Sequence, residues 1–299
     1  MTNLVFIWDY DGPIGRINCS LPYNFHYKQI IDEIENVNKI VSLANDYNFK
    51  MVFAVTGFSC ERTNTIFDLR DQIKMLHDNG HEIASHSWKH EWFPHLNRKQ
   101  AKKSIERSVN VISKCIGKTI SGFILPFNRP MTWYSKGAIS LGDNAFWPFH
   151  YNADLGNVIT LLSLQGVKWL RVHYYPFIIR HFRKGNQIIK KQPFFKKNVL
   201  CLPSHIVGFS NQSIKLLDIA VNTNRDIFIS SHPLNLSLKG GGHLDLFKRF
   251  LDSIMGLQKD NEAFIHEAKE IYKFLDHYFL CEKVKSVFGV SEISRWKIR

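Results

Sequence analysis

The chain has 299 residues, of which 44% are hydrophobic and 13% aromatic, and it carries a formal net charge of +13. This composition supports a large hydrophobic core and argues against a wholly disordered chain. No apolar run approaches the length that a membrane span needs. The strong positive charge favours an anionic partner, such as a phosphorylated sugar, a lipid-linked glycan or a nucleic acid.

Two further features bear on the compartment. The N-terminus enters an apolar strand at once, without the basic and apolar regions of a secretory signal. The five cysteines are scattered and never stand in a CxxC spacing, so neither a disulfide framework nor a thiolate zinc site is indicated. Together these features predict a cytoplasmic protein.

The hydrophobic pattern alternates between strands and helices along the chain. Apolar runs rich in β-branched and aromatic residues predict buried strands, and apolar positions at helical spacing predict amphipathic helices. In chain order we expect a strand at 4–8, a helix at 27–47, a strand at 51–55, a helix at 65–77, a strand at 81–85, a helix at 98–116 and a strand at 121–125. Weaker strands follow at 145–149, 168–173 and 199–202, then a strong strand at 226–231, a helix at 244–255 and a terminal helix at 261–279. This alternation predicts a mainly parallel sheet or barrel, since parallel strands need crossover connections.

Polar residues stand where several of these strands end. Asp9 and Asp11 follow the first strand, His86 follows the strand at 81–85, and His232 follows the strand at 226–231. Active sites of parallel barrels and open sheets form at the carboxyl ends of their strands. We therefore expect these side chains to converge on one face of the molecule.

The pair His86 and His90 predicts a metal site. On a helical turn, two imidazoles four residues apart point the same way and can share one ion. With a carboxylate from Asp9 or Asp11, they would complete a His-His-carboxylate set that keeps one position open, as catalytic zinc sites do. The alternatives are that the two aspartates cap a turn before the Gly-Pro pair at 12–13, and that His232 caps a strand end. His81, His95, His173 and His205 are interpreted as structural or substrate-lining.

Three motifs in order give the chain a family resemblance. They are WDYDGP at 8–13, HSWKH at 86–90, and ISSHP at 229–233, which ends an apolar strand. With these motifs the chain resembles the polysaccharide deacetylases of carbohydrate esterase family 4, the NodB-homology group. Two positions depart from the family pattern. The adjacent aspartate pair has become Asp-x-Asp, and Ile124 stands where the third motif has an arginine. Arg129 and Arg171 are the candidates to replace that arginine in space.

The resemblance implies a fold and an activity. The fold is an α/β distorted barrel of the polysaccharide deacetylase type, with mostly parallel strands and outer helices. We expect a single catalytic domain over 1–299, with the motifs within 4–255 and a helical C-terminal extension at 256–299. The activity is metal-dependent removal of an N-acetyl group from an amino sugar, with Zn²⁺ or another divalent transition metal as cofactor.

The resemblance also implies roles for individual residues. Asp11, His86 and His90 would hold the metal ion. Asp9 would act as the general base, and His232 would donate a proton to the leaving nitrogen. The main chain near Phe127 would help to hold the oxyanion.

A basic stretch remains to be explained. Residues 168–198 contain nine Lys or Arg and no Asp or Glu, interleaved with aromatic residues. One interpretation is a solvated excursion between strands. The other is a segment that binds an anionic substrate, with Trp169 and Arg171 as contacts beside Phe127 and Arg129, or that docks on an acidic membrane surface. No nucleic acid is expected as a partner, because no nucleic-acid-binding motif is present.

Substrate and activity stay open at this point. A glycan, a nucleotide sugar or a lipid-linked surface-polysaccharide precursor at the inner face of the membrane would each suit a cytoplasmic deacetylase. One alternative is hydrolysis of another amide or ester. The other is a family member that binds carbohydrate without turnover.

Overall fold

The computed structural model describes residues 2–19, 26–93, 96–128, 155–172, 192–237, 242–259 and 263–264. Its strands are β1 (Thr2–Tyr10), β2 (Val52–Val55), β3 (Glu82–Ser85), β4 (Gly122–Ile124), β5 (Trp169–Val172), β6 (Phe194–Lys196), β7 (Val199–Pro203), β8 (Ile206–Val207), β9 (Ile227–Ser231) and β10 (Ala263–Phe264). Its α-helices are α1 (Gly12–Cys19), α2 (Tyr27–Asp46), α3 (Arg70–Asp78), α4 (Arg98–Ile116), α5 (Leu155–Leu164), α8 (Asn211–Asn222) and α9 (Gly242–Lys259). Three 3₁₀ segments, η1 (Gly57–Cys60), η3 (Pro126–Asn128) and η5 (Pro233–Ser237), lie in the connections.

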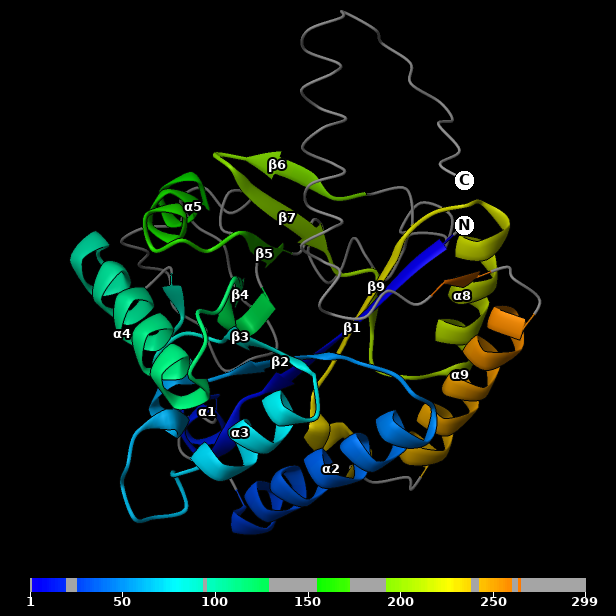
Figure 1. Cartoon of the computed structure of the whole chain (residues 1–299), viewed down its shortest axis with the longest axis horizontal. Coiled ribbons are helices and arrows are strands. Elements are labelled where there is room, and N and C mark those ends of the chain that lie inside the picture. Colours follow the sequence, from blue (N-terminus) through cyan, green and yellow to red (C-terminus); the bar gives the residue numbers. More distant parts are fainter. Residues whose placement is uncertain are drawn as a thin grey trace, which may run out of the picture.

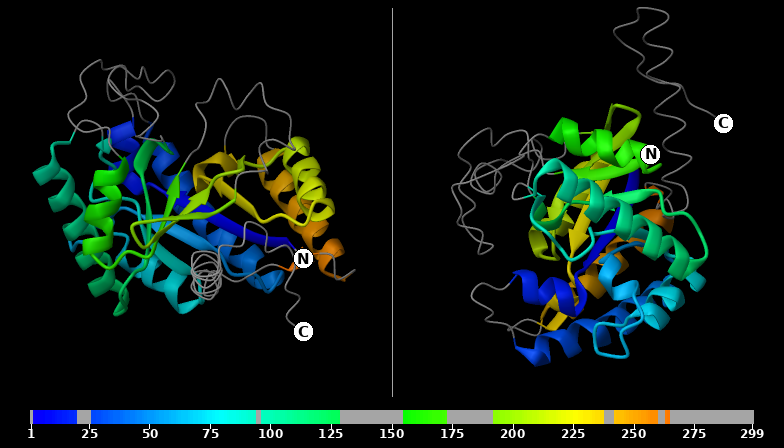
Figure 2. Two further views of the ribbon diagram at one scale, coloured as in Figure 1. Left: turned by 90° about the horizontal axis from the view of Figure 1, so that it is seen from above. Right: turned by 90° about the vertical axis from the view of Figure 1, so that its left-hand side faces the viewer.

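The strands form one curled sheet in the order β6-β7-β5-β4-β3-β2-β1-β9-β8, with β10 also paired to β1. Every pairing is parallel except that of β6 with β7. Helices surround the strands: α4 and α5 lie to one side, α2 and α3 below, and α8 and α9 to the other side (Figure 1). The views from above and from the side show the same arrangement (Figure 2). The predicted barrel-like α/β fold is confirmed.

A short link draws the two ends of the sheet together. β7 pairs with β5, whereas β8, which follows after two residues, pairs with β9 at the other end of the strand order. Within the link, the backbone N–H of His205 donates to the carbonyl of Phe228 at 2.9 Å. The hydroxyl oxygens of Ser204 and Ser230 lie 2.7 Å apart. The sheet therefore curls into a distorted barrel with an interior.

The two faces of β1 show where the core and the interior lie. Leu4, Phe6 and Trp8 belong to the large hydrophobic cluster between the sheet and the helices. Val5 and Ile7 belong to a second, smaller cluster on the opposite face, because successive side chains on a strand alternate. This interior cluster comprises Val5, Ile7, Val52, Ala54, Ala84, Ile124, Trp169, Leu200, Leu202 and Phe228. The alternation places Asp9 on the interior face.

Most expected elements are present, with differences that have physical reasons. α3 begins at Arg70 rather than at residue 65, because the Asp68 carboxylate accepts hydrogen bonds from the backbone N–H groups of Thr63 and Arg70. Such local bonds compete with helix formation. The predicted helix at 261–279 is wrong at 263–264, which form β10 beside β1. The predicted strand at 145–149 lies outside the described residues.

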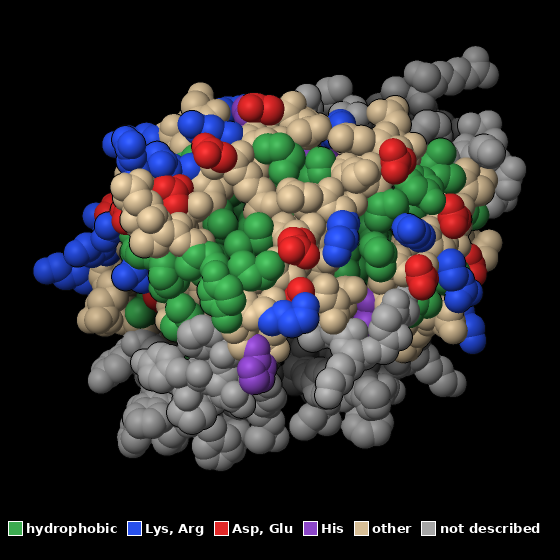
Figure 3. Space-filling model, turned by 90° about the horizontal axis from the view of Figure 1, so that it is seen from below, with side chains coloured by type: hydrophobic (Ala, Val, Ile, Leu, Met, Phe, Trp, Pro, Cys, Tyr) green, Lys and Arg blue, Asp and Glu red, His purple; other side chains and the backbone are tan. Residues whose placement is uncertain are grey.

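The described helices include none long and apolar enough to cross a membrane. Seen from below, Lys and Arg side chains gather at the left edge of the molecule, over α4 (Figure 3). The sequence of α4 contains six Lys or Arg and one Glu. The positive charge is therefore not confined to the stretch at 168–198.

Candidate metal centre

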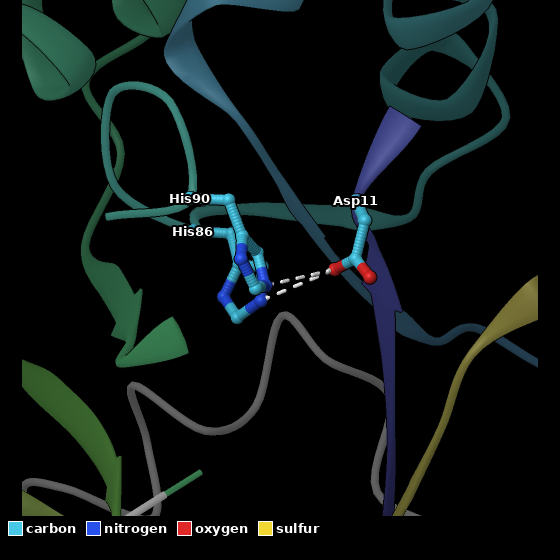
Figure 4. Close-up of side chains that lie close together, drawn as sticks. All are labelled: Asp11, His86 and His90. Atoms are coloured by element: carbon cyan, nitrogen blue, oxygen red, sulfur yellow. Dashed lines mark ion pairs between the residues drawn. The ribbon is translucent and has the colours of Figure 1, made fainter. Parts of the chain in front are cut away.

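Asp11, His86 and His90 come together at the carboxyl ends of β1 and β3. Asp11 is the first residue after β1, and His86 is the first after β3. In the close-up, both imidazoles face one oxygen of the Asp11 carboxylate (Figure 4). All three side chains are buried, with relative exposures of 1%, 1% and 3%. The predicted convergence of strand-end residues is thus present in the structure.

The two histidines lie on a tight turn rather than on a helix. Ser87 and His90 both have positive φ angles, of 68° and 60°. The Glu91 carboxylate stabilises this turn by accepting hydrogen bonds from the Ser87 hydroxyl at 2.7 Å and from the Lys89 N–H at 2.9 Å. The expectation that helical spacing aligns the imidazoles is therefore wrong. They meet because the turn folds back on itself, with ring centroids 4.8 Å apart.

The distances between the three side chains suit a tetrahedral ion. Asp11 Oδ1 lies 3.3 Å from His86 Nε2 and 3.4 Å from His90 Nε2. Bonds of about 2.0–2.2 Å to a tetrahedral zinc ion place two ligand atoms about 3.3–3.6 Å apart. One ligand atom from each residue lies within 4.8 Å of the other two. One cation therefore fits among them.

The hydrogen bonding behind the ligands also favours a positive charge among them. His86 Nδ1–H donates to the Ile124 carbonyl at 2.9 Å, so its Nε2 presents a lone pair toward Asp11. Asp11 Oδ1 is buried and, within the described part of the chain, accepts no hydrogen bond of good geometry. Two lone pairs at this distance repel unless a positive charge lies between them. The residues present fit a divalent transition-metal ion.

The pKa values point the same way. Burial would lower the pKa of His90, but Cys19 and Asp11 outweigh burial and raise it to about 9. Burial would raise the pKa of Asp11, but Arg16 and His90 hold it well below its ordinary value. The cluster thus draws a positive charge to itself, which a proton on His90 or a metal ion can supply.

Beside this cluster, Asp9 forms an ion pair with Arg171. The guanidinium donates two hydrogen bonds, from Nη1 to Asp9 Oδ1 at 2.7 Å and from Nη2 to Oδ2 at 2.6 Å. Both side chains are at most 1% exposed. Burial would raise the pKa of Asp9, but Arg171, His86 and His232 together lower it to about 2. Asp9 is therefore ionised across the physiological range.

The position of Arg171 explains the isoleucine in the third motif. Arg171 on β5 is the register partner of Ile124 on β4. Ile124 packs in the interior cluster, and the guanidinium reaches Asp9 from the neighbouring strand at the same level. Of the two candidate replacements, Arg171 is in place and Arg129 lies outside the described residues. Because Arg171 is buried against Asp9, it does not fit the predicted role as a substrate contact.

His232 completes the group. Its Nε2 lies 3.8 Å from Asp9 Oδ2 and 3.8 Å from Asp11 Oδ2, and its side chain keeps 29% exposure. Burial lowers its pKa, and the neighbouring aspartates oppose that shift without reversing it. His232 is therefore the member of the group that lies between the carboxylates and solvent.

The two aromatic residues predicted to contact substrate lie in different environments. Phe127 lies at the site: its ring packs against His90 with centroids 4.8 Å apart, and its φ angle is 62°. Trp169 is fully buried in the interior cluster, and its indole N–H donates to Glu82 Oε1 at 2.8 Å. Trp169 is thus a core residue, and the prediction that it contacts substrate does not fit.

Sequence reasoning missed three residues behind the ligands. Arg16 and Cys19 lie on α1, and Glu33 lies on α2. Cys19 Sγ is 3.2 Å from His90 Nδ1, and Arg16 pairs with both Asp11 and Glu33. The available signal was Pro13, since proline is favoured in the first turn of a helix. The hydrophobic pattern alone predicts no element at 12–19.

Comparison with known proteins gave a family and a fold. The family model for polysaccharide deacetylase matches residues 29–142, which include His86 and His90. A search of curated proteins gave no significant match. Among solved structures, a protein from Mycobacterium smegmatis described as a candidate polysaccharide deacetylase aligns over 99% of this chain and 95% of its own, at 12% identity and a TM-score of 0.64.

Two further structures share the fold. A candidate polysaccharide deacetylase from Pseudomonas aeruginosa PAO1 aligns over 91% of this chain and 90% of its own, at 11% identity and a TM-score of 0.59. PuuE allantoinase aligns over 91% of this chain and 89% of its own, at 11% identity and a TM-score of 0.61. The comparisons agree with what the motifs indicated: residues 29–142 match the polysaccharide deacetylase family, and the chain shares the fold of these structures.

Proposed function

We propose that this protein is a metal-dependent hydrolase that removes the N-acetyl group from an amino sugar. The observation that carries the proposal is the buried cluster of Asp11, His86 and His90, with Asp9 and His232 beside it at one end of the barrel. Function is argued here from the site, because the fold alone hosts several activities.

Each residue of the site has a chemical task in this proposal. Asp11, His86 and His90 would hold a divalent ion, with Zn²⁺ as our first choice. Such an ion supplies Lewis acidity, which lowers the pKa of a water molecule and polarises an acyl oxygen. Asp9 accepts the proton of the attacking water, and His232 delivers a proton to the departing nitrogen.

The structure qualifies the role of Asp9. A carboxylate with a pKa of about 2 is always ionised but is a weak base, since general bases work best near the operating pH. Its negative charge therefore contributes alongside proton transfer. Arg171 holds both oxygens in place, so the carboxylate keeps one orientation. Loss of a proton-transfer residue costs about 10²–10⁴-fold in rate.

Phe127 supports an oxyanion role for the main chain. A bulky residue with positive φ is uncommon, and such strain concentrates at functional sites. The Phe127 ring packs against His90, so this turn lies beside the ligand cluster. We propose that a backbone N–H of this turn stabilises the developing negative charge on the acyl oxygen.

The finer substrate assignment rests on charge. We propose an N-acetylated sugar with an anionic portion, such as a nucleotide sugar or a lipid-linked precursor at an acidic membrane surface in the cytoplasm. Not every cation of the 168–198 stretch is available for it. Arg171 pairs with Asp9, and Lys197 Nζ donates to the Thr160 hydroxyl at 2.6 Å. Most of this stretch lies outside the described residues.

A second candidate is the hydrolysis of a different amide. The fold is shared with an allantoinase, so a barrel of this shape does not by itself select a sugar. A third candidate is binding of carbohydrate without turnover. Such a protein would have the same fold and bind the same ion but would release no product.

The test is acetate release from a panel of N-acetylated nucleotide sugars and short glycans, with hydrolysis of the allantoin ring followed in a separate assay. Zinc-loaded protein, chelated protein and an Asp9→Asn variant are compared, and circular dichroism and metal analysis confirm that the variant is folded and loaded. We expect zinc-dependent acetate release that the variant loses by about 10²–10⁴-fold. Activity on allantoin alone would favour the second candidate, and bound metal without any product the third.

A further inference from the structure

Helix α1 packs directly on the proposed metal ligand Asp11. The helix begins at the next residue, and positions 15, 16 and 19 share the face that turns back toward the site. A Cβ on Gly15 would lie 2.5 Å from Asp11 Cβ, which is closer than atoms can approach. A glycine here therefore lets the helix approach closely and brings the side chain of Arg16 to the carboxylate.

Arg16 is held between two buried carboxylates. Its Nη2 donates a hydrogen bond to Asp11 Oδ2. Its Nε lies 3.3 Å from Glu33 Oε2, and its Nη2 lies 3.5 Å from Glu33 Oε1. Glu33 has no exposed surface, and the Arg16 side chain is only 16% exposed. Glu33 thus braces the guanidinium from the side opposite Asp11.

This arrangement makes the two oxygens of Asp11 different. Oδ2 is engaged by Arg16, whereas Oδ1 accepts no good hydrogen bond from the described residues and faces His86 Nε2 and His90 Nε2. Among the described residues, the guanidinium donates the hydrogen bond to Oδ2 that opposes rotation of the carboxylate and its binding through both oxygens. Groups that hydrogen-bond to metal ligands fix their orientation, and their loss typically costs 10–100-fold in metal affinity.

We propose that Arg16, braced by Glu33, is a positioning residue that commits Asp11 to bind the metal ion through Oδ1 alone. This inference rests on the proposed function, since it takes Asp11, His86 and His90 as ligands. It adds a residue pair outside the three family motifs. It also gives a role to α1, whose first turn follows the ligand without a connecting loop.

Charge must be separated from positioning in the test. Removing Arg16 alone deletes a positive charge near a dication, which by itself would tighten metal binding. Arg16 and Glu33 together carry no net charge when both are ionised. Burial raises the pKa of Glu33 to about 7, so binding is measured above that pH. There the double variant Arg16→Met/Glu33→Gln removes the hydrogen-bonding fork while leaving the net charge facing the ion unchanged.

The experiment measures Zn²⁺ affinity by competition with a chromophoric chelator, and the ligand field by the visible spectrum of the Co²⁺-loaded protein. Three variants are compared with wild type: the double variant, Arg16→Lys and Arg70→Met. Arg70→Met is the control, because the guanidinium of Arg70 pairs with Asp68 away from the metal centre. We expect the double variant to bind Zn²⁺ about 10–100-fold more weakly, with an altered cobalt spectrum. Arg16→Lys, which retains a cation but not the fork, should fall between wild type and the double variant. Arg70→Met should match wild type.

Two results would overturn the idea. The first is wild-type affinity with an unchanged cobalt spectrum in the double variant. The second is tighter binding in that variant. If the double variant does not fold, Arg16→Lys is the only test of the proposal. An unchanged cobalt spectrum and zinc affinity in Arg16→Lys would then contradict the positioning role. An Asp11→Asn variant separates this failure from that of the proposed function. If Asp11→Asn also binds Zn²⁺ like wild type, the ligand assignment itself is wrong.

Discussion

At the scale of single residues, Asp9 and Arg171 form a buried ion pair at the edge of the metal centre. Two charges are removed from water, and two short hydrogen bonds join them. A buried pair of this kind contributes little net stability, because desolvation offsets attraction. Removal of one member is costly, since the other charge stays buried and loses the hydrogen bonds of the pair. The pair is therefore best understood as a device that orients Asp9.

This reasoning gives a stability prediction. Arg171→Met should lower the free energy of unfolding by about 3–5 kcal/mol, because the buried charge of Asp9 then loses its two hydrogen bonds from the guanidinium. Asp9→Asn/Arg171→Met should recover part of that loss, since no charge remains. Urea unfolding measures the free energy of unfolding of both variants. Lys28→Met is the control, because it breaks an exposed pair with Asp32. An Arg171→Met protein as stable as the control would contradict the buried-pair argument.

At the scale of elements, the segment η1 connects the two halves of the metal centre. The backbone N–H groups of Gly57 and Phe58 donate to the carbonyls of Ser87 and Trp88, each at 2.9 Å, and so support the histidine turn. The Thr56 hydroxyl donates to the Asp11 carbonyl at 3.2 Å. One short connection after β2 thereby holds ligand segments that follow β1 and β3.

Gly57 allows η1 to pack closely against α4. A Cβ there would lie 2.7 Å from the backbone Cα of Ser108 in α4. Gly57→Ala should therefore lower the free energy of unfolding by about 1–3 kcal/mol, as overpacking does, and should also weaken metal binding. Gly256→Ala is the matched control, because its Cβ meets nothing within 4 Å in α9. That change should raise helix stability by up to about 1 kcal/mol. Thermal unfolding of both variants checks the contrast, and equal effects would refute it.

At the scale of the whole molecule, the barrel has a polar site at each end of its interior. The carboxyl ends of the strands carry the metal centre. At the start of β3, near the opposite end, Glu82 accepts hydrogen bonds from the Trp169 indole at 2.8 Å and the Ser121 hydroxyl at 3.2 Å. Burial raises the pKa of Glu82 to about 7, and these bonds only partly oppose the shift.

The raised pKa predicts a pH dependence of stability. Between pH 4.5 and about 7 the folded protein retains a proton on Glu82 that the unfolded chain has released. Raising the pH through this window therefore favours unfolding. The contribution of Glu82 to the stability of the folded protein is fully present only below the pKa of Glu82 in the unfolded chain. Glu82→Gln keeps the hydrogen-bond acceptor but does not titrate. The variant should gain stability relative to wild type across the window, by no more than about 3 kcal/mol.

The measurement is the free energy of unfolding of both proteins from pH 4 to 8. His81 has the opposite slope, because burial lowers its pKa to about 4, so its unfolded form binds the extra proton. Both proteins contain His81, and the difference between them isolates Glu82. Parallel curves for wild type and Glu82→Gln would show that the carboxyl titrates normally.

The sequence by itself determined the features that depend on local pattern. Alternating strands and helices predicted the barrel-like sheet, and α4 begins and ends where expected because the capping residue Asn97 and the left-handed Gly117 mark its ends locally. Asp11, His86 and His232 were found because a residue that follows a parallel strand must lie at the carboxyl edge of the sheet. α8 was missed although Ser210 caps it, because its apolar positions were not recognised as helical.

Only the tertiary structure decided which groups surround those residues. Arg171 reaches Asp9 because the curled sheet sets β5 beside β4 with Ile124 at the same level. Trp169, two residues earlier, enters the interior rather than contacting a sugar. Arg16 meets Glu33 because α1 and α2 pack together, although the two residues are distant in sequence. A buried carboxylate must find a cation, but register and curvature of the sheet, which no local pattern encodes, determine which one it finds.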